Sequence, residues 1–77
     1  MLYPRIRALR RERNLTQEAV GRAVGVARRT YGYYETAARR IPFKVLVGLA
    51  IFHGTSVDFL VGLSDDPRPY PPSKQAP

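Results

Sequence analysis

The segment LTQEAVGRAVGVARRTYGYYE, residues 15–35, contains two helix-like apolar patterns separated by a short break at Gly25. Thr16 is a natural N-cap and Glu18 follows in the first turn, where its charge suits the helix dipole, so we expect a helix over residues 17–24. Gly25 is a typical helix stop. The apolar face of this helix would consist of Val20, Ala23 and Val24.

The second pattern predicts a helix over residues 28–36, although Ala27 is a weak N-cap. With about 100° per residue, Tyr31 and Tyr34 fall on one side and face the core. The opposite, outward side carries Arg28, Arg29, Gly32 and Tyr33 near the start of the helix. Two helices joined by a tight glycine-containing break are typical of a helix-turn-helix unit.

The rest of the chain predicts three more helices, over residues 4–13, 42–52 and 57–61, with Leu46, Leu49 and Ala50 facing inward. No segment alternates with period two, so we expect an all-α, compact five-helix bundle. We assign residues 1–64 to this domain. The sequence DDPRPYPPSKQAP, residues 65–77, is rich in proline with almost nothing to bury, and predicts an extended or flexible tail.

The charge is concentrated in the first half of the chain. Residues 1–44 carry eleven of the thirteen basic residues and three of the six acidic ones, a net charge of +8, while the remainder carries −1. Such asymmetry favours a polyanionic partner, and nucleic acid fits better than a membrane surface. The alternative is an arginine-rich surface that is simply solvated.

Several classes of function are disfavoured by composition. The chain has no cysteine and a single histidine, His53, so we expect no metal and no cofactor. It has no glycine-rich phosphate loop and no evident acid–base pair, so we expect no catalytic site. No apolar run is long enough to span a bilayer and no leader is apparent, so a cytoplasmic protein is expected.

The residues together resemble a known family. IRALRRERNLTQEAVGRAVGVARRTYGYYE, RRIPFKVLVGLA and GTSVDFLVG are similar to the phage-repressor-type (XRE-like, lambda-repressor-like) helix-turn-helix transcription regulators, over about residues 5–63. Ala27, Gly21 and Ala37 depart from the family pattern, and Gly32 replaces a side chain that often reads a base.

The resemblance implies sequence-specific binding of double-stranded DNA, with the helix of residues 28–36 in the major groove. The positions matching base-reading residues are Arg28, Arg29, Gly32 and Tyr33; those matching contacts to the DNA backbone are Thr16, Gln17, Arg40, Phe43 and Lys44. Arg10 and Glu35 match a pair that often forms a structural salt bridge. For Tyr33, plain surface remains an alternative to DNA contact.

One recognition helix covers only a few base pairs, so we expect a homodimer on DNA. In related repressors the pairing surface lies around positions matching Phe43, Val57 and Phe59, although Phe59 has the alternative of completing the monomer core. We expect no small-molecule ligand. The rival function is a protein-interaction module of the same fold, such as an antirepressor, an antitoxin component or a coactivator-like partner.

Overall fold

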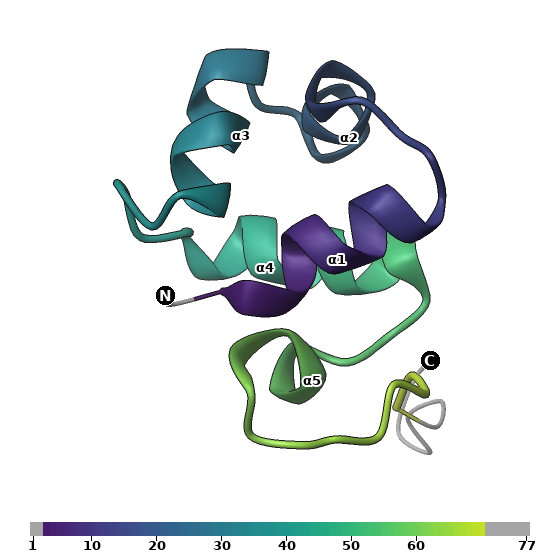
Figure 1. Cartoon of the computed structure of the whole chain (residues 1–77). Helices are drawn as coiled ribbons and strands as arrows, with labels where there is room; N and C mark the ends of the chain where they lie inside the picture. Colours follow the sequence, from purple (N-terminus) through teal and green to yellow (C-terminus); the bar gives the residue numbers. More distant parts are fainter. Residues whose placement is uncertain (1–2, 71–77) are drawn as a thin grey trace, which may run out of the picture.

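The computed structural model describes residues 3–70, and within them the chain forms five α-helices and no strand (Figure 1). The helices are α1 (Pro4–Glu12), α2 (Gln17–Val24), α3 (Arg28–Glu35), α4 (Phe43–His53) and α5 (Val57–Val61). The all-α, five-helix prediction is confirmed, and each predicted helix end lies within one residue of the observed one. No helix in this part of the chain has the length and apolar character needed to cross a membrane.

Polar side chains and left-handed residues fix the helix ends. The hydroxyl of Thr16 accepts a hydrogen bond from the amide of Ala19 at 3.0 Å, which caps α2. Gly25 ends α2 with φ of 79°, a left-handed conformation that costs glycine little. Helix α3 begins differently, because Ala27 offers no side-chain cap. Ala37, just after α3, adopts φ of 62° without the freedom of glycine.

The helices form two ends joined by a middle layer. Helices α2 and α3 pack together at one end, α5 lies at the other, and α1 and α4 run between them (Figure 1). The core between these elements consists of Tyr3, Ile6, Val20, Tyr31, Tyr34, Ile41, Leu46, Leu49, Ala50 and Leu60. Tyr31 and Tyr34 therefore face inward as predicted, which turns the opposite side of α3 to solvent.

The expected apolar face of α2 was wrong in one position. Val20 is buried and Val24 half-buried, but Ala23 is exposed, and Gly21 is buried in its place. A Cβ on Gly21 would lie 2.9 Å from the carbonyl oxygen of Val26. The missing side chain thus lets the turn into α3 lie directly on α2, and the buried face rotates toward Gly21.

Residues 65–70 contain no helix or strand, in keeping with the expected extended tail. They are nevertheless tied to the domain, because the Arg5 guanidinium donates to the Asp65 carboxylate at 2.7 Å. Pro69 and Tyr70 lie beside α4 and α5. The rest of the predicted flexible tail, residues 71–77, lies outside the described residues.

Candidate nucleic-acid interface

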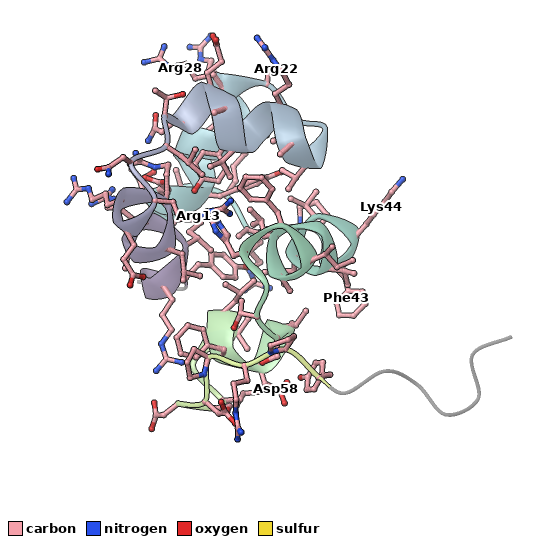
Figure 2. The ribbon with its side chains drawn as sticks, turned by 90° about the vertical axis from the view of Figure 1, so that its right-hand side faces the viewer. Arg13, Arg22, Arg28, Phe43, Lys44 and Asp58 are labelled. Carbon is pink, nitrogen blue, oxygen red and sulfur yellow. The ribbon has the colours of Figure 1, made fainter. Side chains whose placement is uncertain are left out.

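The first turn of α3 is the most cationic exposed surface of the helix-turn-helix unit. Arg28 and Arg29 are both exposed, and no carboxylate within residues 3–70 lies in ion-pair distance of either. Figure 2 shows Arg28 projecting from the surface at the α2–α3 end. A hollow of about 540 Å³ lies here, and it is lined by Gln17, Arg28, Arg29, Gly32, Tyr33 and Thr36.

The structure therefore brings Gln17 together with all four residues that match base-reading positions. Gln17 reaches across from the start of α2, and its amide oxygen would lie 3.5 Å from a Cβ on Gly32. Its amide nitrogen donates to Glu35 at 3.2 Å. Gly32 thus leaves open the space that Gln17 and the two arginines surround, and a polar group entering it would meet several donors.

Beneath this hollow, Glu35 connects three helices. Its side chain is fully buried, with 0% exposure, and Arg10 of α1 donates to both carboxylate oxygens, at 2.6 and 3.0 Å. Arg7 donates to the same carboxylate at 3.3 Å. Arg10 also donates to the carbonyl oxygen of Leu15 at 2.9 Å, at the entrance to α2. The carboxylate thereby holds α3 in a fixed position on α1 and α2.

The pKa values of Glu35 and of its buried neighbour Tyr31 follow from their contacts. Burial alone would raise the pKa of Glu35, but hydrogen bonds from Arg10 and its other neighbours outweigh burial and lower the pKa to about 2. Burial and the adjacent carboxylate raise the pKa of Tyr31. The Tyr31 hydroxyl itself is buried without a hydrogen bond of good geometry. Glu35 therefore stays ionised and Tyr31 neutral near pH 7.

Most arginines of α1 serve the fold rather than the surface charge. Besides Arg7 and Arg10, Arg5 stacks 4.0 Å from the ring centroid of Phe59 and donates to its carbonyl oxygen at 2.8 Å. Arg13, the residue directly after α1, also stacks on an aromatic ring, that of Phe52, at 4.7 Å. Four of the eleven basic side chains of residues 1–44 are thus held by contacts within the domain, although they keep their charge. The sequence carried no periodic signal for these contacts, since each joins residues far apart in the chain.

Of the residues that match DNA-backbone contacts, Gln17 lines the hollow and the other four lie outside it. The hydroxyl of Thr16 is used as the α2 cap. Arg40, Phe43 and Lys44 are exposed at the approach to α4 and in its first turn. Figure 2 shows Phe43 and Lys44 both projecting outward from α4. Lys44 carries an unpaired charge within the described part of the chain.

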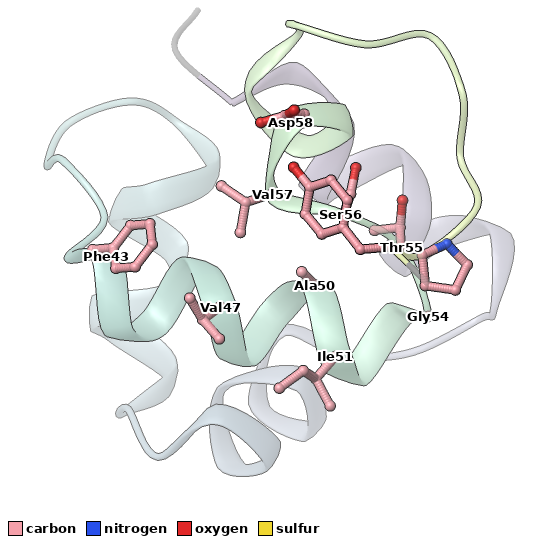
Figure 3. Close-up of a pocket in the computed structure, with 11 residues that line it drawn as sticks. Phe43, Val47, Ala50, Ile51, Gly54, Thr55, Ser56, Val57 and Asp58 are labelled. Carbon is pink, nitrogen blue, oxygen red and sulfur yellow. The ribbon is translucent and has the colours of Figure 1, made fainter. Parts of the chain in front are cut away.

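A second concave surface lies between α4, α5 and the segment after α5 (Figure 3). This apolar groove has a volume of about 580 Å³, and it is lined by Phe43, Val47, Ala50, Ile51, Gly54, Thr55, Ser56, Val57, Asp58, Pro69 and Tyr70. Phe43 is 71% exposed and Ile51 76% exposed. Phe59, the third residue expected at a pairing surface, does not line the groove and is half-buried under Arg5.

The remaining side chains show no metal-binding arrangement. Within residues 3–70 no three histidine, cysteine or acidic side chains gather closely enough to hold an ion. Both ring nitrogens of His53 are buried without a partner, and burial, with the nearby charge of Arg13, lowers its pKa. His53 is thus a neutral packing residue that meets Phe52 edge to face, at 5.0 Å between ring centroids.

Comparison with known proteins agrees with this geometry. The family model described as helix-turn-helix matches residues 6–60, from α1 into α5. The chain is 41% identical over 69 residues to an uncharacterised HTH-type transcriptional regulator, YobD, of Bacillus subtilis (strain 168), covering 90% of this chain and 62% of that protein. It is 37% identical over 65 residues to RstR, the cryptic phage CTXphi transcriptional repressor, of Vibrio cholerae, covering 84% and 59%.

The chain thus spans about three fifths of the length of both relatives. No solved structure gives a significant match. The match of the family model extends over most of the described residues and includes both helices of the α2–α3 unit, so the family predicted from the sequence is confirmed. The chain belongs to the helix-turn-helix family.

Proposed function

We propose that the chain binds double-stranded DNA sequence-specifically and regulates transcription. In this proposal it acts in the cytoplasm and is not an enzyme. The observation that carries this proposal is the first turn of α3, where two exposed arginines with no acidic partner among residues 3–70 line an open hollow. Arginine pairs in bidentate fashion with guanine O6 and N7 in the major groove. The relatives, one named a transcriptional regulator and one a transcriptional repressor, support the same activity.

In this proposal α3 lies in the major groove with its N-terminal turn toward the bases. Arg28 and Arg29 read base edges, Gly32 allows close approach, and Tyr33 completes the facing surface. Gln17 stands at the N-terminus of α2, where free backbone amides and its own side chain suit a phosphate. The hydrogen bond from Gln17 to Glu35 supports this arrangement, because it fixes α2 and α3 relative to each other.

The charge outside the hollow supplies the sequence-independent part of binding. Arg40 and Lys44 contact phosphates from the approach to α4 and its first turn, while Thr16 and Phe43 lie along the same backbone. Each neutralised phosphate contributes about −0.9 to the slope of log K against log salt concentration. Arg40→Ala and Lys44→Ala should each flatten that slope and weaken binding to every sequence. Arg68→Ala, which removes an equal charge from the segment after α5, is the matched control.

The chain acts as a homodimer on DNA, with the apolar groove between α4 and α5 as the pairing surface. Phe43 and Val57 line it, and the exposure of Phe43 and Ile51 supports a covering partner. Phe59, held beneath Arg5, belongs to the monomer in this arrangement. Two-fold pairing would set two α3 helices about 34 Å apart on half-sites about 10 base pairs apart.

The experiment is selection of bound duplexes from a random-sequence pool, followed by footprinting and sedimentation on a selected duplex. The proposal expects an enriched, two-fold repeated motif and two chains per duplex. A single unrepeated half-site bound by one chain would remove the dimer. If no sequence is enriched from the pool and no duplex is bound at low salt, the proposed DNA recognition is refuted. That outcome would favour the rival protein-interaction module.

A further inference from the structure

Tyr33 is in contact with two arginines from different parts of the chain. Its hydroxyl accepts a hydrogen bond from Nε of Arg29 at 3.0 Å, one turn earlier on α3. The guanidinium of Arg39 lies over its ring, 4.8 Å from the centroid. Tyr33 is only half-buried, and its ring stands at the edge of the hollow on α3.

The backbone brings Arg39 to this place. The amides of Ala38 and Arg39 both donate to the carbonyl oxygen of Tyr33, at 2.9 and 3.4 Å. The chain therefore turns back on the last turn of α3 and sets residue 39 beside the ring. Ala37 makes this turn with its positive φ of 62°. Arg39 is thus fixed both by its backbone and by its side chain.

The guanidinium groups of Arg29 and Arg39 both contact the side chain of Tyr33, one at its hydroxyl and the other over its ring. Within residues 3–70 no carboxylate pairs with either of them. Two exposed positive charges on one side chain repel each other only weakly in water, and an anion placed beside them is attracted to both. The buried carboxylate of Glu35 is already occupied by Arg10, Arg7 and Gln17. The two arginines are therefore suited to bind an anion from outside the described chain, and a nucleic-acid phosphate is an anion of this kind.

The two arginines are placed for different tasks. Arg29 lines the hollow beside Arg28, where base edges would enter, whereas Arg39 does not line it. Arg39 lies beyond the C-terminal end of α3, on the connection that leads through Arg40 to α4. It is exposed there.

We propose that Tyr33 is a positioning residue that aims Arg29 at a base edge through its hydroxyl and Arg39 at a DNA phosphate through its ring. This inference rests on the proposed DNA binding. It assigns Arg39 a contact to the DNA backbone, and it makes Tyr33 act through two arginines rather than read a base itself.

The test separates the hydroxyl from the ring. Tyr33→Phe keeps the ring beneath Arg39 and removes the acceptor for Arg29. Affinities are measured by fluorescence anisotropy over a salt series, with a duplex selected by the wild-type chain and with its single-base variants. We expect Tyr33→Phe to lower discrimination at one or two base pairs by about 2- to 10-fold, the effect of one lost hydrogen bond, with the salt slope unchanged.

Arg39→Ala should do the reverse: the slope of log K against log salt falls by about 0.9 and base discrimination stays as in the wild type. Tyr33→Leu, which lacks both ring and hydroxyl, should show both changes. Arg68→Ala removes one charge from the far end of the molecule and should show neither. Circular dichroism and thermal melting of each variant confirm that the helices persist.

Outcomes are distinguishable from failure of the proposed function. A wild-type chain that binds no duplex overturns the DNA proposal and this inference with it. If the wild type binds specifically while Tyr33→Phe retains full discrimination, the aiming of Arg29 is refuted. If Arg39→Ala keeps the wild-type salt slope, the phosphate contact of Arg39 is refuted, and DNA binding by α3 stands without it.

Discussion

The two ends of α3 are built for opposite purposes. Its last turn holds Tyr34 and the fully buried Glu35, whose carboxylate receives hydrogen bonds from α1 and α2. Its first turn has no side-chain cap and presents Arg28 and Arg29 to solvent. A helix of eight residues thus carries its attachment at one end and its free charges at the other. If the first turn recognises DNA, as we propose, stability and recognition are separated by position, and mutations at the two ends should have different consequences.

The largest effect on stability is expected from Glu35→Gln. The substitution removes a buried charge and leaves Arg10, whose side chain is 14% exposed, without its partner. Breaking a buried ion pair from one side typically costs about 3–5 kcal/mol. Urea unfolding would measure this loss of unfolding free energy. The control is Glu18→Gln, which breaks an exposed pair with Arg22 at 3.6 Å and should change the unfolding free energy by less than about 1 kcal/mol. Equal small losses in both variants would mean that Glu35 does not anchor α3.

The second effect is a dependence of stability on pH. The folded-state pKa of Glu35, about 2, lies below its ordinary value of 4.5. The pair therefore contributes fully above the ordinary value, and its contribution is lost as pH falls toward 2. We expect the unfolding free energy of the wild type to decline over this window more steeply than that of Glu35→Gln. Glu12→Gln should keep the wild-type slope, since that carboxylate is exposed and makes no ion pair within residues 3–70. Parallel curves for the wild type and Glu35→Gln would contradict this assignment.

Two glycines at the contact between α2 and α3, Gly21 and Gly32, should respond to alanine with stability changes of opposite sign. A Cβ on Gly21 would stand 2.9 Å from the backbone oxygen of Val26, and a backbone atom shifts less easily than the end of a flexible side chain. Overpacking of this kind costs about 1–3 kcal/mol, more than the roughly 1 kcal/mol of helix propensity that alanine gains over glycine. Gly21→Ala should therefore lower the urea midpoint without a change in the slope of the transition. A raised midpoint would show that the turn into α3 yields easily.

Gly32→Ala should give the smallest change in stability, and with the opposite sign. The nearest side chain, Gln17, lies at an ordinary contact distance of 3.5 Å, so alanine's helix propensity adds up to about 1 kcal/mol. The same methyl group partly fills the hollow and should weaken specific DNA binding. Calorimetric melting and anisotropy titration would measure the two effects. A variant that binds a selected duplex as tightly as the wild type would mean that the hollow plays no part in recognition.

Much of the fold could be predicted because its signals are local. Thr16 and Gly25 mark the two ends of α2 through contacts within a few residues. The inward and outward sides of α3 followed from helical periodicity. Ala23 was misassigned because the buried face of α2 depends on the turn that Gly21 admits, which periodicity does not encode.

The candidate site was harder to predict from the sequence wherever it depends on contacts between residues far apart in the chain. The diversion of Arg5 and Arg13 onto aromatic rings of α5 and α4 joins residues more than 35 positions apart. The contacts of Tyr33 with Arg29 and Arg39 depend on the path of the chain after α3, and the apolar groove depends on the path of the segment after α5. The net charge alone therefore does not show which arginine side chains are free of contacts within the domain.

The central claim is that the first turn of α3 recognises DNA and contributes little to the stability of the fold. The most direct test combines Arg28→Ala and Arg29→Ala in one chain and measures its affinity for a selected duplex and for a scrambled one at the same salt concentration. The account predicts an unfolding free energy within about 0.5 kcal/mol of the wild type and a selected-to-scrambled affinity ratio lowered by about 10-fold or more. A folded double variant that keeps the wild-type ratio would contradict it.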